Sequence, residues 1–212
     1  MIEQRTDEWH AQRCGKFTGS RFVDVLARNK KTGEKLKAWH ELIWQVVVER
    51  LTQQPMEGPT GFALQWGTDV EPFARQAYEL ETGLAVEESE FIQHPKFPFV
   101  GCSPDGLVGS DGGLEMKCPK SSIVHLERFV EGVPAEYVPQ IQGSMWVTGR
   151  EWWDFVSFDP RMPESHQLFI RRVKRDDAFI ASLAVAIAEA EDAAQSLMDR
   201  VMRSGFIEKE AA

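Results

Sequence analysis

Two carboxylates and a lysine occupy a short stretch of this sequence that predicts a strand entered from a tight turn. Asp105 lies in a Pro-Asp-Gly turn, and the strand expected over residues 114–118 carries Glu115, Met116 and Lys117. Residues two apart on a strand face the same side, about 6–7 Å apart, so Glu115 and Lys117 share a face while Met116 points into the core. A hairpin would bring Asp105 beside Glu115.

This pattern has a chemical interpretation. Two adjacent carboxylates repel each other unless a divalent cation lies between them, and Mg²⁺, for which Mn²⁺ can substitute, prefers oxygen ligands. The backbone carbonyl of Met116 is a further candidate ligand, and Lys117 is placed to orient or deprotonate an attacking water. Such a site hydrolyses phosphodiesters. Alone, the Asp105 turn is an ordinary turn and Glu115-x-Lys117 an ordinary ion pair, but together they favour chemistry.

The elements that position these residues divide the chain into three blocks within one domain, residues 1–212. Residues 1–82 are expected to be mainly helical, 83–175 to form the catalytic sheet core, and 176–212 to be a C-terminal helix. A helix between strands of one sheet predicts a mixed α/β (α+β) fold, with a central mixed sheet flanked by helices.

Local signals place the helices and strands. Thr6 and Ser20 are expected to be helix N-caps, and a helix is expected from Trp66 to Glu81 with Pro72 in its first turn. Turns are expected at residues 104–106 and 111–113. Further helices are expected over 38–53, 123–131, 137–148 and 176–203, and strands over 84–92, 97–102, 107–108, 114–118, 152–158 and 166–173.

Composition excludes several classes of protein. Hydrophobic residues make up 42% and charged residues 27% of the 212, which predicts a sizeable buried core and excludes a disordered chain. The net charge of −9 argues against a generally basic DNA-coating protein, although an enzyme can confine positive charge to one channel. Cys14, Cys102 and Cys118 form no C-x-x-C pair, which excludes a disulfide scaffold or iron–sulfur site and indicates a reducing cytosol.

Five segments in order resemble the phage lambda-type 5′→3′ alkaline exonucleases of the PD-(D/E)xK nuclease superfamily. The resemblance covers the chain from about Trp9 to Arg172. The segments that carry it are Trp9 to Ser20, Gln65 to Glu71, Cys102 to Leu107 with Leu114 to Pro119, Gln140 to Thr148, and Asp159 to Met162. The resemblance implies a restriction-endonuclease-like core with a helical N-terminal region.

The resemblance also implies roles for individual residues. Asp105, Glu115, Glu71 and the Met116 carbonyl would hold the metal, and Lys117 would act on the water. Gln140 would hold the water or Lys117, with Gln142 second in rank. Phosphate contacts are implied for Arg13, which would bind the 5′-phosphate, and for Thr18, Ser20 and Ser103. A guanidinium suits phosphate, and a helix beginning at Ser20 would add an anion site.

The implied function is a Mg²⁺-dependent exonuclease. It would resect linear double-stranded DNA from 5′ ends to mononucleotides and leave a 3′ single-stranded tail. The family implies a ring-shaped homotrimer and a phage single-strand annealing protein as partner in recombination. Its place would be the cytoplasm of a bacterial host cell, encoded by a phage or prophage.

Two alternatives share these residues. One is a structure-selective or endonucleolytic relative with the same metal core, which would cut a covalently closed circle. The other is a DNA-end-binding protein without turnover, against which the intact set of Asp105, Glu115 and Lys117 argues. Other chemistry lacks support, because the histidines show no zinc spacing and no phosphate-loop or nucleophile-elbow motif is present.

Overall fold

The computed structural model describes residues 4, 6–56 and 62–204. Helices alternate with short strands, as the sequence predicts, and the mixed α/β fold class is confirmed. The helices are α1 (Asp7–Arg13), α2 (Phe22–Val25), α3 (Lys37–Thr52), α4 (Phe62–Thr82), α5 (Ser122–Glu131), α6 (Val138–Thr148) and α7 (Asp177–Ser204). The strands are β1 (Phe17–Thr18), β2 (Val86–Glu87), β3 (Ile92–Gln93), β4 (Val100–Cys102), β5 (Gly106–Val108), β6 (Gly112–Lys117), β7 (Trp152–Phe158) and β8 (Leu168–Lys174). Single turns of 3-10 helix cover Gly19–Arg21, Ala135–Tyr137 and Glu164–His166.

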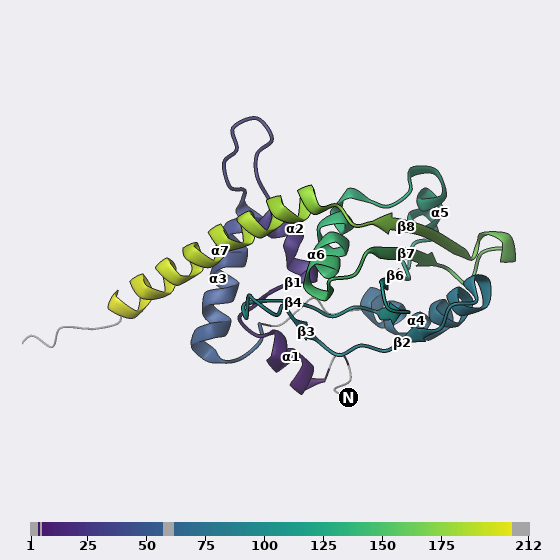
Figure 1. Cartoon of the computed structure of the whole chain (residues 1–212), viewed down its shortest axis with the longest axis horizontal. Coiled ribbons are helices and arrows are strands. Elements are labelled where there is room, and N and C mark those ends of the chain that lie inside the picture. Colours follow the sequence, from purple (N-terminus) through teal and green to yellow (C-terminus); the bar gives the residue numbers. More distant parts are fainter. Residues whose placement is uncertain (1–3, 5, 57–61, 205–212) are drawn as a thin grey trace, which may run out of the picture.

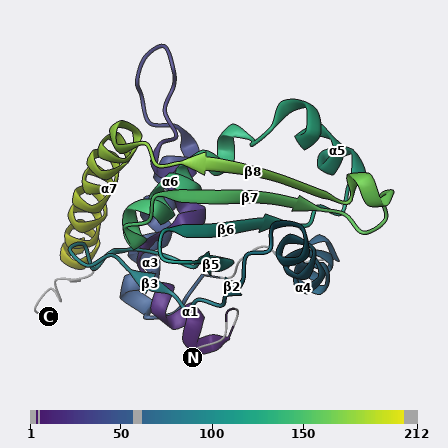
Figure 2. The same cartoon turned by 45° about the vertical axis from the view of Figure 1, so that its right-hand side comes forward.

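A mixed sheet of five strands, in the order β2-β5-β6-β7-β8, forms the centre of the fold (Figures 1 and 2). The pair β6–β7 is parallel, and the other neighbours are antiparallel. Parallel strands need a long crossover connection, which α5 and α6 provide between β6 and β7. This places both helices next to the strand that carries Glu115 and Lys117.

Helices cover both faces of this sheet. On one face, Val70 and Tyr78 of α4 pack against Leu114 and Met116 of β6. On the other face, α6 buries Ile141 and Met145 against Trp153, Phe155 and Phe169. Because side chains alternate along a strand, Glu115 and Lys117 point toward the α6 face while Met116 is in the core, as predicted.

A second sheet, in the order β1-β4-β3, lies beside the first and joins the helical part of the chain (Figure 1). Its strands share a core with α2, α3 and α7, formed by residues such as Phe17, Phe22, Val46 and Leu183. Strand β1 pairs in parallel with β4, which ends three residues before Asp105. The N-terminal segment is thereby held next to the turn that carries Asp105.

Two sequence predictions about helix starts are wrong. Ser20 is not an N-cap, because it lies inside the turn Gly19–Arg21 and α2 has four residues, so no long helix begins there to bind an anion. The helix α4 begins at Phe62, not at Trp66, and Pro72 is therefore in its interior. Packing of α4 on the sheet supports the helix through this proline, although a proline removes one backbone hydrogen bond.

Two predictions about strands and turns are also corrected, and one strand was not expected. The segment 84–92 is not one strand, since β2 and β3 belong to different sheets, and β1 was not expected. Gly112 and Gly113 begin β6 rather than forming part of a turn. The Trp153 ring covers Gly113 so closely that a Cβ there would lie 2.2 Å from it, so a strand residue with a side chain would not fit.

Other predictions hold. Thr6 caps α1 by accepting a hydrogen bond from the Trp9 N–H. The strands expected over 107–108 and 114–118 are present as the antiparallel pair β5 and β6, in which Gly106–Val108 pairs with residues 112–114. Asp176 accepts hydrogen bonds from the first N–H groups of α7. Among the described residues, no helix is both long enough and apolar enough to cross a bilayer.

Candidate active site

Asp105 is held against β6 by a backbone hydrogen bond. The pairing of β5 with β6 ends at Gly106 opposite Leu114, so the next N–H group of β6 on that side lacks a strand partner. The Asp105 carboxylate replaces that partner and accepts a hydrogen bond of 2.6 Å from the Met116 N–H. The turn and the hairpin therefore place one carboxylate at the edge of the strand that carries the other, as the sequence predicts.

Glu115 is almost completely buried and is surrounded by donors. It is 1% exposed, and its carboxylate is in a short ion pair with the Lys117 ammonium group. Gln140 of α6 donates to both carboxylate oxygens at 2.7 Å. Gln140 was expected to hold Lys117 or water, but its contact in this structure is with Glu115. It thus fixes the orientation of the carboxylate.

The charges of Asp105, Glu115 and Lys117 lie close enough to shift the pKa values of Asp105 and Lys117. Burial raises the pKa of the Asp105 carboxyl to about 8, and the negative charge of Glu115 adds to that rise. Burial lowers the pKa of Lys117, but the carboxylates of Glu115 and Asp105 outweigh burial and hold that pKa above its usual value. Lys117 therefore remains an ammonium ion in this state.

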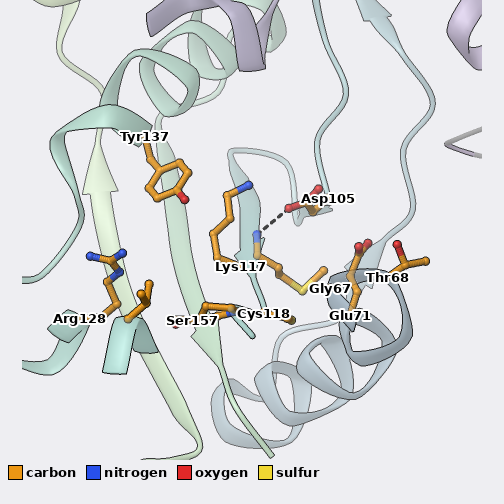
Figure 3. A pocket seen from close by; sticks show the side chains of 12 residues that line it. Gly67, Thr68, Glu71, Asp105, Lys117, Cys118, Arg128, Tyr137 and Ser157 are labelled. Atoms are coloured by element: carbon orange, nitrogen blue, oxygen red, sulfur yellow. Dashed lines mark hydrogen bonds between the residues drawn. The ribbon is translucent and has the colours of Figure 1, made fainter. Parts of the chain in front are cut away.

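A pocket of ≈ 260 Å³ opens beside this group, between β6, α4 and α5 (Figure 3). Asp105, Lys117 and Glu71 line it, and in Figure 3 Lys117 lies between Asp105 and Tyr137, with Glu71 on the far side of Asp105. Glu71 is in the interior of α4, so a helix-end effect does not explain its position. We call Asp105, Glu115, Lys117 and Glu71 the acidic pocket.

The donor atoms of the acidic pocket fit a hard divalent cation. Burial and the neighbouring charge of Glu115 both disfavour the ionised form of Asp105, and a bound cation would relieve both effects. Among the described residues, no three His, Cys, Asp or Glu side chains converge as a ready-made metal cage. Mg²⁺ does not need one, because it is usually bound by one or two carboxylates and keeps several waters.

Arg13 lies at the centre of a second group of polar side chains. Its guanidinium donates to Ser103 Oγ at 2.9 Å, to Thr18 Oγ1 at 3.2 Å and to Ser20 Oγ at 3.3 Å. Trp9 also donates to Ser103, at 3.0 Å, and its ring stacks 4.2 Å from the guanidinium. We call these five residues the Arg13 cluster. The structure thus brings together all four residues expected to contact phosphate.

The positive charge of Arg13 has no carboxylate partner among the described residues. Burial and the nearby Arg21 lower the pKa of Arg13 to about 10. Within the described ranges, no carboxylate forms an ion pair with Arg13, whose donors go to neutral hydroxyls. Each hydroxyl that accepts from Arg13 keeps its own proton for donation. A half-buried cation surrounded by free hydroxyl protons is suited to an anion such as phosphate.

The acidic pocket and the Arg13 cluster are joined through the backbone. Ser103 precedes Asp105 by two residues, so one short loop serves both. Gly19, between Thr18 and Ser20, packs against Gln140, and a Cβ at Gly19 would lie 3.4 Å from Gln140 Cγ. The segment that binds Arg13 is therefore in contact with the residue that orients Glu115.

Gln142 does not join this site. It is 3% exposed, donates to the Lys174 carbonyl at 2.9 Å and accepts from the Asp176 N–H at 2.9 Å. These contacts fasten α6 to the connection between β8 and α7. Its second-rank place among the candidates therefore stays a prediction that these contacts do not support.

Sequence reasoning missed four side chains that the structure places at or beside the two groups. Trp9 is four residues before Arg13, a spacing that brings two side chains onto one helix face and could have revealed it. Arg75 has the same spacing from Glu71 and donates to the Asp105 carbonyl at 3.2 Å. Tyr137, whose ring lies 5.1 Å from Lys117 Nζ, and Arg128 also line the pocket.

Comparison with known proteins connects this site to nucleases. The alkaline exonuclease LHK-Exo from Laribacter hongkongensis is 38% identical, and its crystal structure superposes with a TM-score of 0.85 over 94% of this chain and 97% of that one. Its complex with dAMP gives a TM-score of 0.86. A phage-related exonuclease from Haemophilus somnus 129PT shares the fold at 18% identity, with a TM-score of 0.67 over 89% of this chain and 96% of that one. The resemblance to phage-type alkaline exonucleases is confirmed.

Sequence comparison agrees with this likeness. The uncharacterized protein YqaJ of Bacillus subtilis (strain 168) is 22% identical over 180 residues, which are 84% of this chain and 53% of that protein. The chain thus spans about half the length of this relative. Residues 8–151, which include the Arg13 cluster and the acidic pocket, match a single family profile. The chain belongs to the family of YqaJ-like viral recombinase domains.

Proposed function

We propose that this protein is a metal-dependent exonuclease that degrades linear double-stranded DNA from 5′ ends to mononucleotides and leaves a 3′ single-stranded tail. One observation carries the proposal: a pocket of carboxylates with a lysine adjoins a half-buried arginine without an anionic partner among the described residues, and one loop supplies both Ser103 and Asp105. The first group is suited to hydrolysis, and the second to recognition of a terminal phosphate. The 38% identity to LHK-Exo, an alkaline exonuclease, supports the same activity.

The residues of the acidic pocket have distinct tasks in this mechanism. Asp105 and Glu115, with Glu71 and the Met116 carbonyl, would hold Mg²⁺ or Mn²⁺. When bound, the cation supplies charge that activates water and stabilises the leaving oxygen. Lys117 holds the attacking water by a hydrogen bond and offsets negative charge at the scissile phosphate. Gln140 keeps the Glu115 carboxylate in place through its two hydrogen bonds.

The Arg13 cluster sets the polarity of the reaction. A terminal 5′-phosphate bound by Arg13, with donation from Thr18, Ser20 and Ser103, positions the first phosphodiester of the strand at the acidic pocket. The binding energy of a group remote from the reacting bond then serves to orient that bond. A 3′ end carries no such phosphate and would be used less well.

The family is also the basis on which we infer the oligomeric state, the partner protein and the cellular location of the enzyme. We infer a homotrimer that encircles DNA, which would confine positive charge to a channel in a protein of net charge −9. A single-strand annealing protein would then take up the 3′ tail for recombination of a phage or prophage in a bacterial cytoplasm. The viral recombinase family supports this setting.

The test is digestion of linear duplex DNA labelled at either end. Mononucleotides should be released from 5′ ends in Mg²⁺ and not in chelator, faster from 5′-phosphorylated than from 5′-hydroxyl ends. A covalently closed circle should stay intact. Cleavage of the circle would favour the endonuclease alternative, and binding of ends without any hydrolysis would favour the non-catalytic one.

A further inference from the structure

Arg128 lies at the end of the pocket opposite the carboxylates. It is half-buried on α5 and lines the pocket together with Val124 and Tyr137 (Figure 3). Over the part of the chain that the structure describes, no hydrogen bond or ion pair engages its guanidinium. Arg128 thus presents a full positive charge and five N–H donors to a cavity whose other end is acidic.

The helix that carries Arg128 is firmly anchored. His125 is completely buried, and its Nε2 lies 2.7 Å from the His166 carbonyl, which can only accept, so Nε2 carries the proton. Nδ1 then accepts from Ser157 Oγ at 2.8 Å. Ser122 at the start of α5 also donates to Asp159 at 2.7 Å. The guanidinium is therefore held on a fixed element, while the Ser157 hydroxyl proton is already used.

We propose that Arg128 binds the phosphodiester that follows the scissile one in the strand being degraded. This inference rests on the proposed function, since it assumes that the scissile phosphate lies beside Asp105 and Lys117. Arg13 and Arg128 then flank the acidic pocket from α1 and α5 and contact phosphates on opposite sides of the cleaved bond. The planar guanidinium suits a phosphodiester oxygen pair, and the adjoining Tyr137 ring offers a surface for the intervening sugar or base.

Two phosphate contacts, one on each side of the cleaved bond, would hold the strand in register. A mononucleotide spans only the Arg13 side and the acidic pocket, so it would lack the Arg128 contact and leave after cleavage, while the polymer stays bound. Arg128 thereby distinguishes the polymeric substrate from the product.

The first test is a comparison of Arg128→Ala and Arg128→Lys with the wild type on 5′-phosphorylated duplex DNA. We expect about a tenfold rise in KM for Arg128→Ala with a smaller change in kcat, and partial recovery in Arg128→Lys. The slope of log affinity against log salt concentration should fall by about 1. Arg203→Ala is the matched control, because Arg203 is exposed on α7, far from α5 in both views (Figures 1 and 2).

The second test locates the contact along the strand. A neutral methylphosphonate is placed at the second linkage from the 5′ end, and release of the first nucleotide is followed in a single turnover. The wild type should be slowed about tenfold, and Arg128→Ala should show no additional slowing. A methylphosphonate at the fourth linkage should change the rate of the wild type and of Arg128→Ala to the same extent.

The outcomes distinguish this inference from the proposed function. If the wild type digests DNA and Arg128→Ala does so with the same KM and salt dependence, the Arg128 assignment is wrong while the nuclease assignment stands. If the wild type digests no DNA, the proposed function itself fails. Weaker binding of dAMP by Arg128→Ala would place Arg128 on the product phosphate and overturn the assignment to the next linkage.

Discussion

The acidic pocket and the Arg13 cluster adjoin each other, but they satisfy their charges in opposite ways. In the pocket, the Glu115 carboxylate is paired with Lys117 and accepts both Gln140 hydrogen bonds, so this charge has its partners within the protein. In the cluster, the Arg13 guanidinium is surrounded by neutral hydroxyls. The charge of Glu115 is thus satisfied internally, whereas the cluster is left open for an anion.

This difference predicts which step each group controls. A cation held by Asp105 and Glu115 would share Glu115 with Lys117, so changes in the pocket are expected to alter the arrangement of these side chains and to act on kcat. An anion entering the cluster displaces no carboxylate, so changes there act on which DNA end is accepted. Variants of the two groups should therefore give different kinetic signatures.

The largest effect is expected in the pocket, for Lys117→Ala. Removal of the ammonium group takes away the donor that is proposed to hold the attacking water, and kcat should fall about 10³-fold. Duplex binding should change little, which a fluorescence anisotropy titration in Ca²⁺ can check. Lys96→Ala, which removes an exposed lysine elsewhere, is the control. Activity at the wild-type rate in Lys117→Ala would contradict the assigned role.

A smaller and more selective effect is expected in the cluster, for Arg13→Ala. The loss of a charged hydrogen-bonding group should slow digestion of 5′-phosphorylated ends about 10- to 100-fold, and of 5′-hydroxyl ends much less. Rates on the two kinds of end, measured in parallel, check this. Equal slowing of both would show that Arg13 does not read the phosphate. Arg13→Lys should recover part of the selectivity, because an ammonium group lacks the fork that reaches three hydroxyls.

Two glutamines on one helix should differ in their effect on activity. Gln140→Ala should lower kcat about tenfold and also lower Tm by a few degrees, since it releases the buried Glu115 carboxylate. Gln142→Ala should lower Tm by a few degrees and spare kcat, since it unties α6 from the β8–α7 connection. Thermal denaturation and single-turnover rates on both variants check the pair. A fall in kcat for Gln142→Ala alone would reverse these roles.

The chemistry of the acidic pocket could be predicted from sequence because it depends on short-range geometry. Alternation along β6 fixes the faces of Glu115 and Lys117, and the turn before β5 fixes Asp105, all within 13 residues of chain. The order of helices and strands after residue 100 followed from periodicity for the same reason. Local rules are reliable where the residues involved are neighbours in the chain.

Features that depend on long-range packing could not be predicted in this way. Pro72 is tolerated inside α4 because α4 packs on a sheet formed by residues far along the chain, and Gly113 is required because of the Trp153 ring. Arg128 could not be predicted as a pocket residue, because nothing near it in the sequence marks it as facing the pocket. Only the crossover from β6 through α5 to β7 brings it there.

The smallest predicted effect concerns the ion pair between Asp159 and Arg161, which lies outside the acidic pocket and the Arg13 cluster. Burial raises the pKa of Asp159, but hydrogen bonds from Arg161 and Ser122 outweigh it and lower the pKa to about 2. Because this pKa lies below that of the unfolded chain, the ionised form stabilises the fold at neutral pH, and that stability is lost as the pH falls from about 4 to about 2. Because Arg161 is 42% exposed and screened by water, we expect the contribution to be about 1 kcal/mol.

Urea denaturation of the wild type and Asp159→Asn should show a difference in unfolding free energy at pH 7 that narrows toward pH 3, with DNA digestion at pH 7 retained. A difference independent of pH would show that hydrogen bonding to the neutral side chain, rather than the charge of Asp159, holds the start of α5 in place.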